Sequence, residues 1–319
     1  MDTPDNNEIE YGFLRAFRSA FEKPFKMFDG VFMYSEKIIF HYTTLEGFVG
    51  ILKNRGFRLS NPRFLNDAEE VLNGVKLATQ LIALLLPKKR YKQFKNVLSK
   101  THEKLLEQKF NKYYVASFSL DGDSLAQWRA YAANGAGISI GFDTGKKTKF
   151  PHFSCLPDYY LTKVIYDDRE KVKIMLHVVK QYANEYQKDI KKIGARYDDD
   201  YADYLVLSLS FFFINFKNSA FSAEQEVRIV LSTQDTDQFG GKEYRISNGL
   251  IVPYVCTYNL HIKEPESGNK IKPDPLPISN VVIGPIAHQD AVIESIKTFL
   301  SDSGYSNVEV TKSKIPYRG

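Results

Sequence analysis

The chain has 319 residues, of which 43% are hydrophobic and 25% charged, and its formal net charge is +5. These ordinary globular values exclude disorder, collagen or coiled coil over the whole chain. Cys155 and Cys256 are far apart and form no C-x-x-C pair. This excludes a disulfide-framed domain and a cysteine-rich zinc module. The small positive charge permits a nucleic-acid partner without requiring one.

The apolar segments are too short to cross a membrane. The longest runs, Leu81 to Leu86 and Leu205 to Phe216, are far below the ~20 residues that a bilayer requires. The first residues, Met1 to Glu10, are polar and acidic and lack a signal-peptide pattern. We therefore expect a soluble, cytoplasmic protein with no membrane partner.

Apolar spacing predicts elements along the whole chain. Residues 1–36 are expected to form a helical extension, and Thr44 is expected to cap a helix that ends near Gly56. Further helices are expected at 67–86, 88–109, 124–131, 169–193, 199–214 and 288–302. Strands are expected at 38–40, 57–60, 113–119, 138–142, 159–166, 225–232, 242–247, 250–257, 281–284 and 307–311.

Strands and helices mix without strict alternation, which favours an α+β fold over a doubly wound sheet. We interpret 37–319 as one domain with helical insertions near 66–112 and 167–214. Asn66 or Asp67 is expected to cap the helix that starts the first insertion. The lysine-rich part of that insertion is interpreted as a solvated face, with an acidic target such as a nucleic acid as the alternative.

The familiar catalytic motifs are missing from the sequence. The run Gly135 to Gly141 has one residue too many for a dinucleotide fingerprint, and it precedes a strand instead of opening a helix. There is no G-x-S-x-G and no H-E-x-x-H, and the six histidines show no ligand spacing. We therefore expect no metal site.

Three local features carry candidate chemistry. His41-Tyr42-Thr43 lies at a strand end and offers polar, aromatic and hydroxyl groups for a sugar and its base. The alternative is that the imidazole bonds a neighbouring strand. Ser117 and Ser119 share one strand face, and Trp128 and Tyr131 follow on a short helix. These residues are interpreted as a wall of a binding site, with serine hydroxyls in front and aromatic rings behind. The alternative is a structural one, in which the serines lie at a strand edge and the tryptophan belongs to the core.

The third feature is Glu224-Gln225-Glu226, which leads into a strand. Alternation would place Glu224, Glu226 and Arg228 on one face. Paired acids on one face are costly unless a cation or a substrate balances them. The alternative is a salt bridge with Arg228 on an exposed face.

Together, the three features resemble the NAD site of ADP-ribosyltransferases, where an Arg or His, an S-T-S-like element and an E-x-E come from three strands. The sequence also resembles a bacterial family of unassigned function with H-Y-T, F-L-N-D-x-x-E, S-F-S, W-x-x-Y and E-x-E-x-R motifs. These correspond to His41 to Thr43, Phe64 to Glu70, Ser117 to Ser119, Trp128 to Tyr131 and Glu224 to Arg228.

The resemblance implies an α+β fold with a split antiparallel sheet that binds NAD, as substrate, in a cleft. It implies that Glu226 is catalytic and that Glu224 orients the acceptor. The expected NAD-binding residues are His41, Tyr42, Thr43, Ser117, Ser119, Trp128 and Tyr131. Of these, His41 is placed near the adenosine ribose, the serines at the cleft floor, and Tyr131 or Tyr42 on the nicotinamide.

The expected function is therefore an ADP-ribosyltransferase, a glycosyltransferase acting on a protein or nucleic acid as a toxin or phage-defence (antiviral defence) effector. One alternative is an NAD glycohydrolase, in which water is the acceptor. Another is a nucleotide-sensing module without chemistry. A third is a metal-dependent hydrolase that uses Asp67, Glu70 and Glu226.

Overall fold

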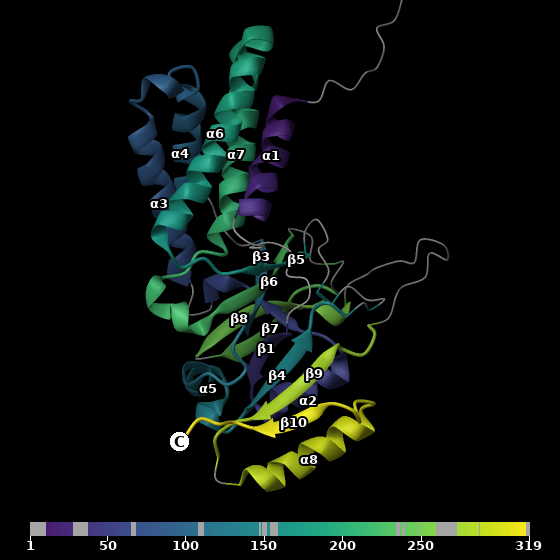
Figure 1. The fold of residues 1–319 in the computed structure, drawn as a ribbon. Helices are drawn as coiled ribbons and strands as arrows, with labels where there is room; N and C mark the ends of the chain where they lie inside the picture. Colours follow the sequence, from purple (N-terminus) through teal and green to yellow (C-terminus); the bar gives the residue numbers. More distant parts are fainter. Residues whose placement is uncertain are drawn as a thin grey trace, which may run out of the picture. The chain divides into compact units, whose positions relative to one another are not determined.

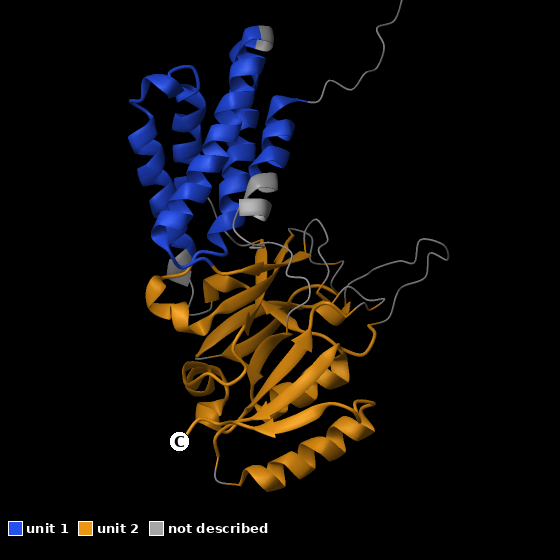
Figure 2. Ribbon diagram, in the orientation of Figure 1, with its two compact units in different colours: residues 1–30, 69–110, 165–216 blue, residues 31–68, 111–164, 217–319 orange. Residues whose placement is uncertain are grey.

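The computed structural model describes residues 11–27, 38–64, 68–107, 112–146, 148, 152–153, 159–233, 237, 240–247, 249–259, 273–286 and 288–316, without the side chains of 21–27, 68–70 and 192–193. The cap expected at Asn66 or Asp67 lies outside these residues. The chain divides into two compact units (Figure 2). Unit 1 comprises 1–30, 69–110 and 165–216, and unit 2 comprises 31–68, 111–164 and 217–319.

Unit 1 is helical. Its helices are α1 (Gly12–Met27), α3 (Ala68–Leu85), α4 (Lys95–Glu107), α6 (Asp168–Ile193) and α7 (Asp198–Phe213). Helix α1 packs against α6 and α7, and α4 packs against α7. The N-terminal extension and the two helical insertions, which the sequence placed as separate additions to one domain, thus gather in one compact unit.

Charge pairs join these helices at their surfaces. Lys100 Nζ lies 2.7 Å from Asp199, and Lys104 Nζ lies 2.5 Å from Asp203, so lysines of α4 pair with aspartates of α7. Part of the lysine-rich face is therefore already balanced by acids of this chain. Exposed pairs of this kind contribute little stability, typically less than about 1 kcal/mol each.

Unit 2 contains an open, mixed sheet with helices packed on it, so the fold class is α+β, as expected (Figure 1). Its strands are β1 (Ile38–Thr43), β2 (Arg58–Ser60), β3 (Tyr113–Ser119), β4 (Ile138–Asp143), β5 (Tyr159–Lys163), β6 (Glu226–Ser232), β7 (Glu243–Ser247), β8 (Leu250–Cys256), β9 (Ile278–Ile283) and β10 (Glu309–Lys312). All the named strand pairs are antiparallel except β9 with β10. The helices of this unit are α2 (Leu45–Asn54), α5 (Leu125–Tyr131) and α8 (Gln289–Asp302).

The predicted cap of α2 is confirmed, because the Thr44 hydroxyl accepts a hydrogen bond from the Gly47 amide at 3.1 Å. Several boundaries differ from the prediction. Strand β1 extends to Thr43 instead of ending at residue 40, and β9 begins at Ile278 instead of residue 281. The strand expected over 159–166 ends at Lys163, and the helix expected from residue 88 begins at Lys95. A short 3₁₀ turn, Lys89–Tyr91, precedes α4 because Tyr91 and Phe94 turn inward and become buried.

The sheet divides at β3. Strand β6 pairs along the whole of one edge of β3, from Tyr113↔Ser232 to Ser119↔Glu226. The other edge is shared, because β1 meets β3 at Ser119 and β2 meets it at Val115. Between these two pairings, the edge of β3 has no partner strand among the described residues. The divergence of β1 from β2 therefore leaves the middle of β3 accessible from one side.

Aromatic packing joins the start of β2 to β3 and β4. Phe57, which leads into β2, meets Phe118 of β3 and Phe142 of β4 edge-on, each with ring centroids 5.2 Å apart. These rings are 3% exposed or less. Such pairs contribute about 0.5–1.5 kcal/mol beyond the apolar area that they bury. No helix in the described part of the chain is both long and apolar enough to span a membrane.

Gly137, in the turn before β4, packs directly against β1. A Cβ atom at this position would lie 2.2 Å from the Thr43 carbonyl oxygen. We predict that Gly137→Ala lowers the free energy of unfolding by about 2 kcal/mol, because backbone must move to admit the methyl group. Urea denaturation measures the change.

Gly50 of α2 provides the matched control, because a Cβ atom there meets nothing within 4 Å. Gly50→Ala should leave the stability unchanged or raise it by up to about 1 kcal/mol. Equal stability of the two variants would contradict the close packing of Gly137 on β1.

Candidate functional site

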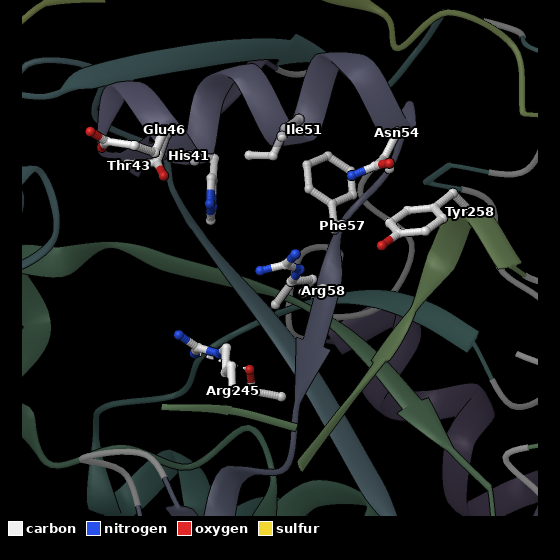
Figure 3. A pocket seen from close by; sticks show the side chains of 14 residues that line it. His41, Thr43, Glu46, Ile51, Asn54, Phe57, Arg58, Arg245 and Tyr258 are labelled. Carbon is white, nitrogen blue, oxygen red and sulfur yellow. Dashed lines mark hydrogen bonds between the residues drawn. The ribbon is translucent and has the colours of Figure 1, made fainter. Parts of the chain in front are cut away.

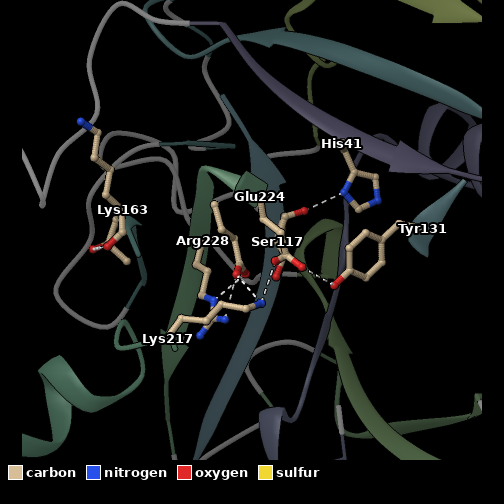
Figure 4. A network of polar contacts seen from close by, with 9 residues as sticks. His41, Ser117, Tyr131, Lys163, Lys217, Glu224 and Arg228 are labelled. Carbon is tan, nitrogen blue, oxygen red and sulfur yellow. Dashed lines mark hydrogen bonds and ion pairs between the residues drawn. The ribbon is translucent and has the colours of Figure 1, made fainter. Parts of the chain in front are cut away.

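A cleft of about 600 Å³ lies where β1 and β2 diverge from β3. Its walls include His41 of β1, Ser117 of β3 and Tyr131 of α5, together with Glu224 and Glu226 at the start of β6 (Figure 4). The three sequence features therefore converge on one hollow of unit 2, although they are distant in the chain.

Lys217 links the two glutamates. Its Nζ lies 2.8 Å from Glu224 Oε2 and 2.9 Å from Glu226 Oε2 (Figure 4). Arg228 donates to Glu226 from Nε at 2.6 Å and from Nη2 at 3.0 Å. Two cations thus balance two carboxylates. Lys217, Glu226 and Arg228 are all 4% exposed or less, so this is a buried charge cluster and not the exposed salt bridge that the sequence left open.

The backbone between the glutamates has an unusual conformation. Glu224 ends a 3₁₀ turn, Ser219–Glu224, and Gln225 adopts φ +44° before β6 begins at Glu226. A left-handed conformation costs a non-glycine residue roughly 1–2 kcal/mol. The left-handed turn at Gln225 lets Glu224 and Glu226 reach the same ammonium group. Regular strand alternation had been expected to place them on one face. Strain of this kind concentrates at functional sites.

Glu226 is ionised, and both of its carboxylate oxygens accept hydrogen bonds. Burial alone would raise its pKa, but the attraction and hydrogen bonds of Arg228, followed by the attraction of Lys217 and a hydrogen bond with Ser117, lower the pKa to about 2. Carboxylates that accept several charge-assisted hydrogen bonds behave in this way. Both oxygens of Glu226 therefore already have strong donors within the protein.

Glu224 has different surroundings. Its Oε2 binds Lys217, while Oε1 has Tyr131 as a donor at the long distance of 3.4 Å. Its side chain is 12% exposed and borders the cleft. Tyr131 is 41% exposed and lies on the same wall. Of the two carboxylates, Glu224 is therefore the one with an oxygen that a ligand in the cleft can approach.

His41 bonds the free edge of β3. Its Nδ1 lies 2.9 Å from the Ser117 carbonyl oxygen, where a partner strand would otherwise donate. Because a carbonyl only accepts, Nδ1 carries the proton and Nε2 is an acceptor. Burial lowers the pKa of the imidazole, against the opposing effect of the bond to Ser117. His41 is thus a neutral acceptor at the cleft, and it also makes the strand contact that the sequence left as its alternative.

Two of the expected NAD-binding residues instead support the cleft wall. Tyr42 is 6% exposed, and its hydroxyl donates to the Asp121 carbonyl and accepts from the Ser124 amide, both at 2.8 Å. Trp128 is fully buried and packs edge-on against Tyr42. These rings hold the connection from β3 to α5. Tyr42 borders the cleft but is almost wholly covered. Trp128 lies in the core, which its spacing also suits, and it does not line the cleft.

Ser119 and Thr43 also lie apart from the cleft. Ser119 is fully buried, and its hydroxyl donates to the Glu224 carbonyl at 2.7 Å. It therefore anchors the turn that carries Glu224 and is not part of the cleft floor. Thr43 borders an adjoining pocket of about 350 Å³ (Figure 3). Ser117 alone of the two serines lines the cleft.

Lys217, Arg58 and Arg245 were missed at the level of sequence. Lys217 follows the apolar end of α7 and gives no motif signal. Arg58 and Arg245 both border the cleft, yet each stands in an ordinary alternating strand. Among the described residues, no group of three or more His, Cys, Asp and Glu side chains is arranged to hold a metal ion.

Comparison with known proteins finds a family model that matches part of the chain. A family model described as a protein of unknown function, DUF2971, matches residues 127–229. The match agrees with the expected likeness to a family of unassigned function, and it includes Tyr131, Lys217 and both glutamates. No curated protein and no solved structure matches the chain.

We predict that Glu226→Gln lowers the free energy of unfolding by about 3 kcal/mol or more, because it leaves Arg228 and Lys217 buried without their full counter-charge. The ordinary pKa of Glu226 is 4.5, and folding lowers it to about 2. Its stabilising contribution is therefore complete above the ordinary value and is lost as the pH falls through the folded value.

The stability difference between wild type and Glu226→Gln should thus be constant from about pH 7 to about pH 5 and shrink towards pH 3. Urea denaturation at several pH values measures it. Other carboxylates titrate in both proteins and cancel in the difference. A difference below about 1 kcal/mol at neutral pH would contradict the buried cluster.

For His41, we predict a pKa below the ordinary 6.5, because burial disfavours the imidazolium. Histidine ring shifts followed by NMR across this range measure the value, and the spectrum of His41→Gln identifies the resonance. A pKa at or above 6.5 would contradict the buried imidazole described above.

Proposed function

We propose that the chain is an NAD-dependent ADP-ribosyltransferase. The observation that supports this most strongly is the convergence of His41, Ser117 and the two glutamates around one cleft at a division of the sheet. A neutral imidazole acceptor and a serine hydroxyl are suited to ribose hydroxyls. A carboxylate with an accessible oxygen is suited to a sugar carbon that becomes positive.

The reaction breaks the bond between nicotinamide and its ribose. The electron pair of that bond leaves with the pyridinium nitrogen, which becomes neutral, and positive charge develops on the ribose. A lone pair of the acceptor forms the new bond to the ribose carbon, and its proton passes to a carboxylate. A carboxylate ~4 Å from the developing charge contributes roughly 4 kcal/mol at an effective dielectric constant of ~20. Because the charge arises only in the transition state, this attraction accelerates the reaction.

We assign that carboxylate to Glu224. The resemblance implied Glu226 as the catalytic carboxylate. Its charge, however, is balanced by Arg228 and Lys217, whose side-chain nitrogens lie 2.6–3.0 Å from its oxygens. Glu226 then acts as a positioning residue, since it fixes Lys217 and Lys217 fixes Glu224. Tyr131, exposed on the same wall, is the ring available to stack on nicotinamide.

We predict that Glu224→Gln lowers nicotinamide release from NAD by about 100-fold or more while leaving the fold intact. Incubation with NAD labelled in its adenosine part, in the presence of cell lysate, measures turnover and shows which acceptor receives the label. Label on free ADP-ribose identifies water as the acceptor.

Glu294→Gln is the matched control, because Glu294 is exposed on α8 and lines neither cavity. Full activity of Glu224→Gln, with activity lost in Glu226→Gln at a temperature where both remain folded, would return the catalytic role to Glu226. Absence of NAD turnover in the wild type under all conditions, without lysate and with it, would contradict the proposed function.

A further inference from the structure

Two arginines meet at the junction of the cleft with the adjoining pocket. Arg58 of β2 and Arg245 of β7 line both cavities, as does His41 (Figure 3). Their guanidinium groups border the same space beneath the His41 ring. Arg58 is exposed, whereas Arg245 is half-buried.

Neither arginine forms a salt bridge with a carboxylate among the described residues. The Arg58 guanidinium lies over the Tyr254 ring, 5.1 Å from its centre. Arg245 donates from Nη2 to the Ser60 hydroxyl at 3.2 Å, while its buried Nε has no acceptor. The nearby carboxylate of Glu243 instead accepts from the Tyr254 hydroxyl at 2.6 Å. Glu46 also lines the pocket, on the exposed start of α2.

The surroundings of Arg245 disfavour its positive charge. Burial, followed by the positive charge of Arg58, lowers the pKa of Arg245. A buried guanidinium nitrogen without an acceptor adds the cost of lost hydration. Two like charges therefore border one space, and the Arg245 Nε donor lacks an acceptor there; an anion would balance the charges and accept from this donor. Guanidinium groups bind phosphate oxygens through paired, charge-assisted hydrogen bonds.

We propose that Arg58 and Arg245, with the Ser60 hydroxyl, form a subsite for a diphosphate group. The assignment to the diphosphate of a dinucleotide rests on the proposed function. In that case the subsite fixes the middle of NAD, so that one ribose lies by Glu224 and the other extends into the adjoining pocket. The phosphate chemistry itself follows from the two arginines and is independent of NAD turnover.

Calorimetric titration of the full chain with ADP and with inorganic diphosphate tests the subsite. Adenosine, which lacks phosphate, is the control ligand. Arg245→Met and Arg58→Met should each weaken ADP binding by about 30-fold, because each removes hydrogen bonds to a charged group. Adenosine should bind all the variants alike. Arg245→Lys should restore part of the affinity, since it retains the charge.

Arg63→Met is the matched control, since Arg63 is exposed near β2 and lines neither cavity. Thermal unfolding without ligand gives a second readout. Arg245→Met should unfold at the same temperature as the wild type or higher, because repulsion is relieved, and diphosphate should stabilise the wild type much more than this variant.

Equal ADP affinity in wild type, Arg58→Met and Arg245→Met would overturn the subsite, even if NAD is turned over. A second result would also overturn it: a large loss of stability in Arg245→Met without ligand, together with equally weakened binding of adenosine and ADP. That result would identify Arg245 as a structural residue. Diphosphate binding that depends on both arginines would support the subsite even where NAD turnover is absent and the proposed function fails.

Discussion

The site depends on one buried charge cluster at the start of β6. Lys217 binds Glu224 and Glu226, and Arg228 binds Glu226 with two donors. Burying isolated charges would cost several kcal/mol each. The cluster offsets this cost because its charges balance and its donors and acceptors match. Apolar residues would fill the same volume at no greater cost. The benefit of these charges therefore lies in their position, with one carboxylate oxygen held at the edge of a cleft.

The second constraint is the division of the sheet. Strand β3 is paired along one edge by β6 and only at two points along the other, by β1 and β2. His41 fills part of the gap with a side chain and bonds the Ser117 carbonyl. The free edge of β3 is thereby partly satisfied without a strand, which leaves room for a ligand. Phe57, which leads into β2, packs edge-on against Phe118 of β3 and Phe142 of β4.

Local pattern predicted most elements of the fold, whereas the meeting of the three motifs was implied only by the resemblance to ADP-ribosyltransferases. Period-2 and period-3.6 spacing located β3, β6, α6 and α7 within a few residues, because their apolar faces are continuous. The pattern could not show that α1 and both helical insertions pack into one unit, since such contacts join residues far apart in the chain. It also could not predict the left-handed Gln225, which is not a glycine.

The side-chain roles were harder to predict. Spacing places Trp128 and Ser119 near the motif residues, but it does not say which of them faces inward, and both are fully buried. Lys217 gave no signal because its partners come from a turn after it in sequence and from the next strand. Arg58 and Arg245 look like the polar positions of half-exposed strands. The fold brings them to one space, where neither pairs with a carboxylate in the part of the chain that the structure describes.

The most direct test of the whole account is a crystal structure of the protein with a non-hydrolysable carba analogue of NAD. The account predicts the analogue in the cleft, with the nicotinamide-side sugar carbon within about 4 Å of a Glu224 oxygen and the diphosphate between Arg58 and Arg245. An analogue bound elsewhere, or one with that sugar carbon turned away from Glu224 and from Glu226, would contradict it.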